Sequence, residues 1–144
     1  MTNSNKCKKI KFPSFKDDRG TIAVVEGELD IPFSIKRIYY IYDIPTGAER
    51  GSHAHKTLQQ LIIPISGAFE IELDDGVSKF NFFLSDPCVG LYVPAMHWRK
   101  IVKFTSNAVL FSAVSDHYNE ADYYRNYYEF CKAATQIQNK ASSD

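Results

Sequence analysis

Apolar and polar residues alternate along much of this chain. Residues 68–73 read Ala-Phe-Glu-Ile-Glu-Leu, with apolar and charged side chains in turn. A period of two is typical of a β-strand with one face on a core and the other in water. Asp74-Asp75-Gly76 follows at once and favours a tight hairpin turn. The pattern therefore predicts antiparallel strands joined by short turns.

The same signals recur over the whole sequence. Glycine, proline, asparagine or aspartate stands between short runs rich in β-branched and aromatic residues. No alternation of strands with helices supports a parallel α/β sheet. We therefore expect an all-β sandwich or barrel. The expected strands are 10–12, 21–26, 34–42, the strand of His53 and His55, 59–65, 68–73, 77–84, 90–94, 100–104 and 108–115.

The two ends of the chain differ from this pattern. Residues 1–9 are polar and basic, and we expect a flexible arm. Residues 119–138 lose the period of two and lack glycine and proline, which predicts a C-terminal helix with Tyr123, Tyr127 and Phe130 on one apolar stripe.

Composition narrows the possible functions. The 144 residues suit a single domain, 1–144, and 44% of them are hydrophobic, enough for a sizeable core. Lys+Arg and Asp+Glu both number 17, which argues against a nucleic-acid or membrane-surface protein. No signal peptide or membrane-spanning run is evident. Cys7, Cys88 and Cys131 form no C-x-x-C pair, which indicates reduced thiols in a cytoplasmic protein.

His53 and His55 are the strongest chemical signal. Residues one apart in a strand point to the same face, so both rings can enter one pocket. Three interpretations compete: structural histidines, a metal site completed by residues elsewhere, and acid–base catalysis near neutral pH.

The spacing around these histidines resembles the first cupin motif. Gly47-x5-His53-x-His55-x4-Gln60-x6-Gly67 matches it position for position, except that Gln60 stands where cupins place a metal-binding Glu. In the second motif, Arg99 falls where cupins place a metal-binding His. Because two of four ligands are replaced, we predict a cupin barrel without metal or other cofactor, whose histidines carry protons.

A second resemblance is more specific. Five stretches look like the cupin-type dTDP-sugar 3,4-ketoisomerases, which are WxcM-like proteins, over about residues 12–130. The resemblance implies a cupin (jelly-roll) barrel with a short C-terminal helix. It also implies homodimers with exchanged N-terminal strands and a cytoplasmic role in deoxysugar synthesis for surface polysaccharide. The stretches are 31–42, 50–56, 73–76, 90–94 with Trp98, and 121–127.

The implied reaction moves the ketone of dTDP-4-keto-6-deoxyglucose from carbon 4 to carbon 3. Two proton-transfer groups and stabilisation of an enediolate suffice, and no redox cofactor is required. We favour His55 as the base and His53 as a second shuttle or orienting residue. Tyr39 is the candidate acid or ketone polariser, although a packed aromatic is the simpler interpretation.

The remaining candidate site residues would hold the substrate. Arginine forks pair well with pyrophosphate, although ordinary surface ion pairs are the alternative for each arginine and explain Arg19 equally well. Gln60 is expected to hydrogen-bond the sugar or a histidine, and Trp98 to close the barrel mouth. The candidates are Arg37, Arg50, Gln60, Arg19 and Trp98.

Three other functions remain open at this point. A dTDP-sugar 3,5-epimerase has a different histidine context, and a sugar-binding cupin would bind without turnover. A metal-dependent cupin oxygenase would contain stoichiometric metal. The configuration at carbon 4 of the product is not predicted by the sequence.

Overall fold

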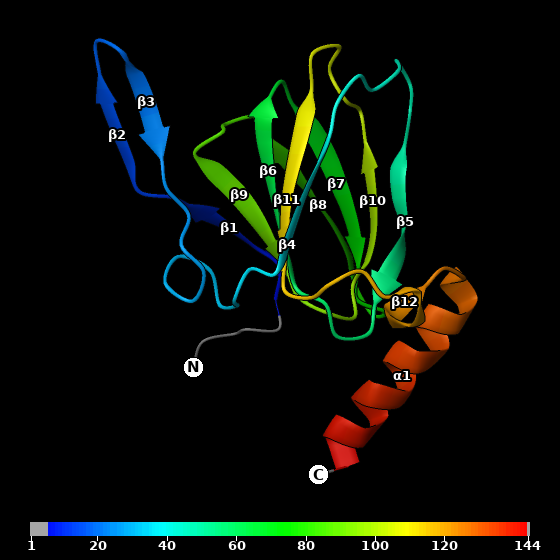
Figure 1. The fold of residues 1–144 in the computed structure, drawn as a ribbon. Coiled ribbons are helices and arrows are strands. Elements are labelled where there is room, and N and C mark those ends of the chain that lie inside the picture. Colours follow the sequence, from blue (N-terminus) through cyan, green and yellow to red (C-terminus); the bar gives the residue numbers. More distant parts are fainter. Residues whose placement is uncertain (1–5, 144) are drawn as a thin grey trace.

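The computed structural model describes residues 6–143, and within them two five-stranded antiparallel sheets form the body of the molecule (Figure 1). Their strand orders are β1-β9-β6-β11-β4 and β12-β5-β10-β7-β8. The predicted all-β jelly-roll fold is confirmed. The strands are β1 (Lys8–Lys11), β2 (Ser14–Asp17), β3 (Gly20–Ala23), β4 (Arg37–Ile41), β5 (Arg50–His55), β6 (Gln60–Ser66), β7 (Phe69–Asp74), β8 (Lys79–Leu84), β9 (Val89–Val93), β10 (Trp98–Val102), β11 (Val109–Val114) and β12 (Tyr123–Tyr124).

The main core lies between the two sheets. In β7, Phe69, Ile71 and Leu73 are buried, while Glu70 and Glu72 between them are partly exposed. Ile62 of β6 and Leu110 of β11 pack into the same cluster from the opposite sheet. In β7, the alternation that predicted the strand therefore separates side chains in the core from side chains that reach solvent.

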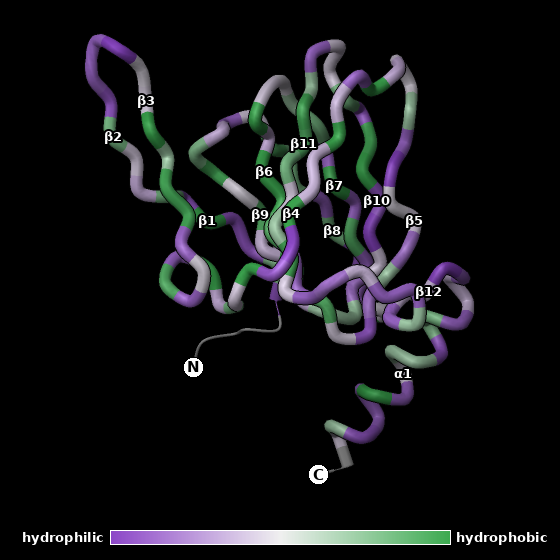
Figure 2. The backbone as a smooth tube through the Cα atoms, in the orientation of Figure 1, coloured by the Kyte–Doolittle hydropathy of each residue, from purple (hydrophilic) through white to green (hydrophobic). Residues whose placement is uncertain are grey.

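The β2–β3 hairpin stands apart from the sheets (Figure 1). All eight of its residues are exposed, and Phe15 pairs with Ile22 across the two strands. Both side chains are 66% exposed. The tube in Figure 2 shows a hydrophilic tip on this projecting hairpin and hydrophobic colour mainly along β3.

The C-terminal helix is shorter at its start than predicted. Residues 119–138 were expected to be helical, but Glu120–Asp122 forms one 3-10 turn and Tyr123–Tyr124 pairs with β5. The side chain of Asn119 accepts from the Ala121 backbone N–H and caps the short turn, which competes with a continuous helix. The α-helix α1 runs over Tyr127–Ser143.

One face of α1 packs against the end of the barrel. Phe130 and Ala134 are buried there with Ala54 of β5, and Trp98 packs against them. Tyr123, predicted for the apolar stripe of the helix, instead lies on β12. Within residues 6–143, no helix is both long enough and apolar enough to cross a membrane.

The N-terminal arm was predicted too long. Lys8 and Lys9 already belong to β1 and pair with Tyr92 and Leu91 of β9. An edge strand can carry exposed lysines because only its backbone must match the neighbour, so charge alone did not mark its start. Residues 1–5 of the expected arm lie outside the described residues.

Candidate active site

A β-bulge places the first histidine. Arg99 of β10 pairs with His53, but the next residue, Lys100, pairs with Gly51, so Ser52 is an extra residue in β5. Gly51 has φ +91°, and a Cβ atom there would lie 2.8 Å from the carbonyl oxygen of Arg99. A side chain would therefore push the strands apart. The glycine allows β5 to set His53 directly opposite Arg99.

A cavity of about 420 Å³ opens at this point, and we call it the histidine cavity. Strands from both sheets contribute to it, together with the segment from residue 118 to residue 125. Its lining combines one histidine, four arginines and three tyrosines with few apolar side chains. The lining residues are Arg37, Tyr39, Ile41, Glu49, Arg50, Gly51, His53, Gln60, Arg99, Ile101, Tyr118, Tyr123 and Arg125.

His55 lies behind His53 and not on the cavity surface. The two ring centroids are 4.8 Å apart in an edge-to-face arrangement, and His55 is 3% exposed. Its Nδ1 lies 3.2 Å from Oδ2 of Asp122. The other carboxylate oxygen of Asp122 accepts from the backbone N–H and the hydroxyl of Thr57, both at 2.9 Å. The carboxylate thus fixes the His55 ring, which in turn supports His53.

Both rings are neutral at physiological pH. Burial, followed by the charge of Arg99, lowers the pKa of His53 to about 4. The same two causes lower the pKa of His55 further, to about 2. A neutral imidazole has a free lone pair, so His53 can accept a proton without first losing one.

Gln60 is the centre of a buried hydrogen-bond network. Its Nε2 donates to the Tyr39 hydroxyl at 2.6 Å and to Ser112 Oγ at 2.7 Å. Its Oε1 accepts from Nη1 of Arg99 at 2.5 Å. Arg99 also donates to the carbonyl oxygen of His97 at 3.0 Å. Two sheets are therefore joined beneath the cavity through one amide.

Arg99 is a buried cation without a carboxylate partner. It is 1% exposed, and no ion pair with Asp or Glu holds it among residues 6–143. In the same part of the chain, its Nε is the one buried side-chain polar atom without a hydrogen-bond partner. Burial lowers the pKa of Arg99, although a guanidinium stays protonated in proteins. The charge faces a cavity in which an anion would be stabilised.

Three further arginines surround the cavity. The Arg37 guanidinium lies 5.7 Å from the ring centres of both Tyr39 and Tyr118. Arg125 lies over Tyr123 at 4.2 Å and forms a two-armed ion pair with Glu120. Together with Arg50 they form a positively charged rim.

The structure brings together five of the predicted site residues. Tyr39, His53, Arg37, Arg50 and Gln60 all line the histidine cavity, and His55 lies directly behind it.

Two predicted substrate contacts lie elsewhere. Arg19 is at the tip of the β2–β3 hairpin, pairs with Asp17, and has a side chain that is 90% exposed. Trp98 packs against Tyr127 and Phe130 beneath α1, because the indole closes the gap between helix and barrel. Trp98 therefore does not reach the cavity of its own chain.

Sequence reasoning missed the residues that the segment after β11 supplies. Tyr118, Tyr123 and Arg125 line the cavity, and Asp122 holds His55. The predicted helix over 119–138 included Asp122, Tyr123 and Arg125, so they were not expected at the site, and Tyr118, which precedes that helix, was given no role. Residues 121–127 were among the stretches that carry the family resemblance. That resemblance could have pointed to these residues, but no role in the site was predicted for them.

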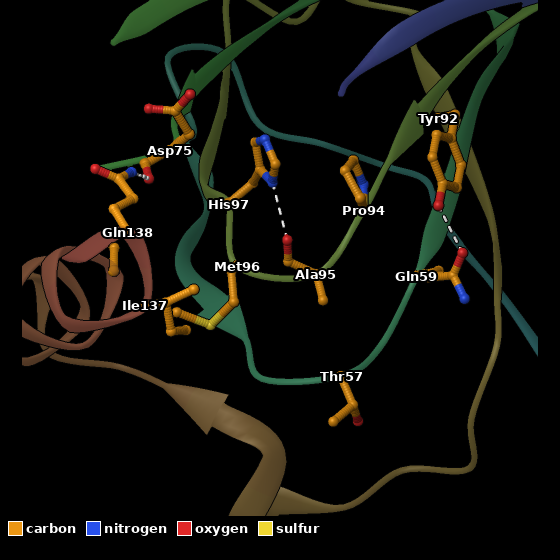
Figure 3. A pocket seen from close by; sticks show the side chains of 11 residues that line it. Thr57, Gln59, Asp75, Tyr92, Pro94, Ala95, Met96, His97, Ile137 and Gln138 are labelled. Atoms are coloured by element: carbon orange, nitrogen blue, oxygen red, sulfur yellow. Dashed lines mark hydrogen bonds between the residues drawn. The ribbon is translucent and has the colours of Figure 1, made fainter. Parts of the chain in front are cut away.

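A larger hollow of about 560 Å³ lies between α1 and the turn after β9, and we call it the helix cavity (Figure 3). Several of its polar groups are hydrogen-bonded within the protein. Tyr92 donates to Gln59 at 2.5 Å, and His97 Nδ1 lies 3.0 Å from the carbonyl oxygen of Ala95. Met96 and Ile137 add apolar lining. Its volume exceeds that of the histidine cavity, but chemically reactive side chains converge on the latter.

The residues at the cupin ligand positions do not fit a divalent metal. The oxygen of Gln60 is used by Arg99, and a guanidinium beside a metal ion would repel it. No cluster of three or more His, Cys, Asp or Glu side chains in residues 6–143 could complete such a site.

Comparisons with known proteins agree with this geometry. Residues 5–135 match the family described as FdtA: WxcM-like, C-terminal. The chain is 41% identical over 130 residues to the TDP-4-oxo-6-deoxy-alpha-D-glucose-3,4-oxoisomerase of Aneurinibacillus thermoaerophilus, covering 90% of this chain and 94% of that protein.

Solved structures give the same result. The sugar 3,4-ketoisomerase QdtA of Thermoanaerobacterium thermosaccharolyticum, in complex with TDP, superposes with TM-score 0.89 at 37% identity, covering 95% of this chain and 98% of that one. A 3,4-ketoisomerase of Helicobacter canadensis gives TM-score 0.87 at 40% identity, covering 90% and 97%. A dTDP-4-dehydrorhamnose 3,5-epimerase of Bacillus anthracis shares the fold at 21% identity, with TM-score 0.73 and coverage of 85% and 79%.

Proposed function

The chain belongs to the WxcM-like (FdtA) family and is an isomerase, and from this premise we propose that it converts dTDP-4-keto-6-deoxy-D-glucose to the dTDP-3-keto-6-deoxyhexose. The convergence of a neutral His53 and Tyr39 on one positively charged cavity carries the proposal. The product would feed deoxysugar synthesis for surface polysaccharide in the cytoplasm.

His53 is the proposed base. Although the sequence favoured His55, His53 lines the cavity and His55 is buried behind it. His53 takes the proton from carbon 3, and the electron pair of that C–H bond forms the carbon 3–carbon 4 double bond. His55 and Asp122 position the His53 ring. The buried charge of Arg99 stabilises the developing enediolate.

Tyr39 is the proposed acid. It gives its proton to oxygen 4 as the ketone becomes an enediol, and its phenolate then takes the proton from oxygen 3. Protonated His53 returns its proton to carbon 4, which leaves the ketone at carbon 3. Each residue ends in its starting state, so no cofactor is consumed.

The arginine rim is the proposed site of the pyrophosphate. Arg37 and Arg50 both line the cavity, and guanidinium forks pair with phosphate oxygens in two-armed geometry. The tyrosines on the same rim offer rings on which a thymine base can stack. Two solved structures of one relative, QdtA, are described as complexes with TDP and, for a mutant of it, with TDP-4-keto-6-deoxyglucose.

We further propose a homodimer with exchanged N-terminal strands. The exposed β2–β3 hairpin and the exposed outer side chains of the edge strand β4, Ile38 and Tyr40, support it. An unpaired edge with apolar neighbours favours pairing with a second chain. In that arrangement Arg19 at the hairpin tip would serve the partner's cavity.

Light scattering after size-exclusion chromatography tests the dimer. We expect twice the 16.4 kDa chain mass for the wild type and the single chain mass for Ile22→Asp. A monomeric wild type would contradict the proposal. Retained dimer in Ile22→Asp would remove the hairpin from the interface.

Incubation with dTDP-4-keto-6-deoxyglucose in deuterated water tests the reaction. NMR should show the carbonyl at carbon 3, with deuterium at carbon 4 only to the extent that protonated His53 exchanges its proton with solvent before returning it. A 3,5-epimerase would instead label carbons 3 and 5 and keep the ketone at carbon 4. Saturable binding of the nucleotide sugar without carbonyl migration would establish a non-catalytic sugar-binding protein.

A further inference from the structure

We propose that Arg99 and Gln60 are positioning residues that fix the direction of the hydrogen bond at Tyr39, so that its hydroxyl proton points into the histidine cavity. The inference rests on the proposed ketoisomerase function and assigns a role to two residues that need not touch the substrate. Each of its steps follows from the donor and acceptor chemistry of the network beneath the cavity.

The first step is the orientation of the Gln60 amide. An amide group has a donor end and an acceptor end, whereas a guanidinium only donates. Nη1 of Arg99 lies 2.5 Å from the end assigned as Oε1. With the amide reversed, two donors would face each other at that distance inside the protein. Arg99 therefore holds the oxygen of Gln60 toward itself and the nitrogen toward Tyr39.

The second step is the direction of the hydrogen bond to Tyr39. Because Nε2 of Gln60 donates to the hydroxyl at 2.6 Å, the oxygen of Tyr39 must accept. Gln60 is the one hydrogen-bond partner of this hydroxyl within residues 6–143. The hydroxyl proton is therefore not used in the network. Since Tyr39 lines the cavity, this proton is available to a group bound there.

The same network stabilises the phenolate that remains after transfer. Gln60 still donates to the phenolate oxygen, and the buried charge of Arg99 lies behind the amide without a carboxylate to neutralise it. Ser112 anchors the second hydrogen of the amide nitrogen at 2.7 Å. Replacing the amide by a carboxylate would reverse both effects, because a carboxylate only accepts and repels a phenolate.

Gln60→Glu is therefore the decisive variant. It keeps the shape of the side chain and provides an ion pair for Arg99, so the fold should be retained. The Tyr39 hydroxyl would then donate its hydrogen bond to the new carboxylate, and its proton would point away from the cavity. We expect kcat for carbonyl migration to fall about 10²-fold, the scale of one proton-transfer group, with KM changed by less than about threefold.

The double variant separates positioning from a general electrostatic effect. In a Tyr39→Phe background, Gln60→Glu should lower kcat by no more than about tenfold, because no hydroxyl proton remains to be redirected and only the partial neutralisation of Arg99 is left. An undiminished 100-fold loss in that background would overturn the proposal. A higher apparent pKa on the acid side of the pH–rate profile of Gln60→Glu alone would also overturn it. Such a shift would show that the substitution acts through His53.

Gln59→Glu is the matched control. It makes the same chemical change one residue away, but its side chain lines the helix cavity and accepts from Tyr92, which a carboxylate can also do. We expect kcat within about twofold of the wild type. A loss equal to that of Gln60→Glu would contradict a specific role for the network.

Neutron diffraction of the deuterated wild-type protein provides a readout besides activity. We expect two deuterons on the atom of Gln60 that faces Tyr39, and a Tyr39 deuteron directed into the cavity. A deuteron lying between Tyr39 and Gln60 on the tyrosine oxygen would overturn the inference. Failure of the wild type to move the carbonyl would instead refute the proposed function and leave the neutron result as the test of the network.

Discussion

The histidine cavity and the helix cavity differ most in what their neighbouring glutamines do. Gln60 lines the histidine cavity and connects Arg99 to Tyr39, so its bonds end on groups with reactive protons or charge. Gln59 lines the helix cavity, and its side-chain oxygen accepts from the Tyr92 hydroxyl at 2.5 Å. The helix cavity is larger, at about 560 Å³ against about 420 Å³.

Volume therefore does not identify the site in this molecule. Each cavity holds one histidine with a pKa lowered mainly by burial. His53, however, faces a tyrosine hydroxyl and several arginines, whereas His97 is bonded to the backbone of Ala95. A proton acceptor needs a donor and a stabilised anion nearby, and of these two cavities the histidine cavity supplies both.

The largest effect should come from exchanging the histidine of each cavity. We expect His53→Asn to lower kcat by about 10³-fold or more, because an amide cannot take the proton from carbon 3. His97→Asn should keep kcat within about threefold, since an amide N–H can still bond to the Ala95 carbonyl. Initial rates followed by NMR of the product, with circular dichroism of each variant, measure both.

A reversed outcome would move the chemistry to the helix cavity. If instead both His53→Asn and His97→Asn kept near-wild-type turnover, the base role would return to His55.

The next effect concerns the support of the base. Asp122→Asn should lower kcat by about tenfold and destabilise the fold by about 1–2 kcal/mol, because an amide cannot replace both acceptor oxygens. Asp86→Asn is the control, since its carboxylate accepts from the backbone of Cys88 in an exposed turn. Urea unfolding gives stability and the NMR assay gives kcat. Equal kinetic losses in the two variants would refute a specific role of Asp122.

The strands and the paired histidines could be predicted because each is a local property. Alternation in residues 68–73 reports which side chains face the core, and two histidines one apart must share a face. The position of Gln60 in the motif likewise pointed to the cavity. Local periodicity therefore determines most of the body of the fold.

What failed depends on contacts that are distant in sequence. Which histidine reaches the cavity is decided by the bulge at Ser52 and by Asp122, which is 67 residues from His55. Residues 119–124 have no helix breaker, but pairing of Tyr123 with His55 overrides helix propensity. Trp98 was expected at the mouth because nothing in the sequence shows that α1 covers it.

A smaller effect is expected from acidification. With the pKa of His53 lowered to about 4, about nine-tenths of the rings remain neutral at pH 5, against a few per cent for an ordinary histidine. We therefore expect kcat/KM to fall by less than about twofold between pH 7 and pH 5. A tenfold loss over that range in folded protein would contradict a buried, neutral base.

Stability must be followed in the same experiment. The unfolded chain binds protons at its histidines near pH 6.5, while His53 and His55 in the folded chain do not until lower pH. The free energy of unfolding therefore decreases as the pH falls from about 6.5 toward 4. Circular dichroism at each pH separates this loss from the kinetic effect.

The smallest effect should come from filling the helix cavity. Ile137→Trp places a large ring in it from α1, where the native side chain is already 52% exposed, so the fold can adapt. We expect kcat and KM within about twofold of the wild type. Ile41→Phe is its counterpart in the histidine cavity and should raise KM for the nucleotide sugar by about tenfold through lost space. If Ile137→Trp raised KM and Ile41→Phe did not, substrate would bind beside α1, and the convergence of His53 and Tyr39 would require another explanation.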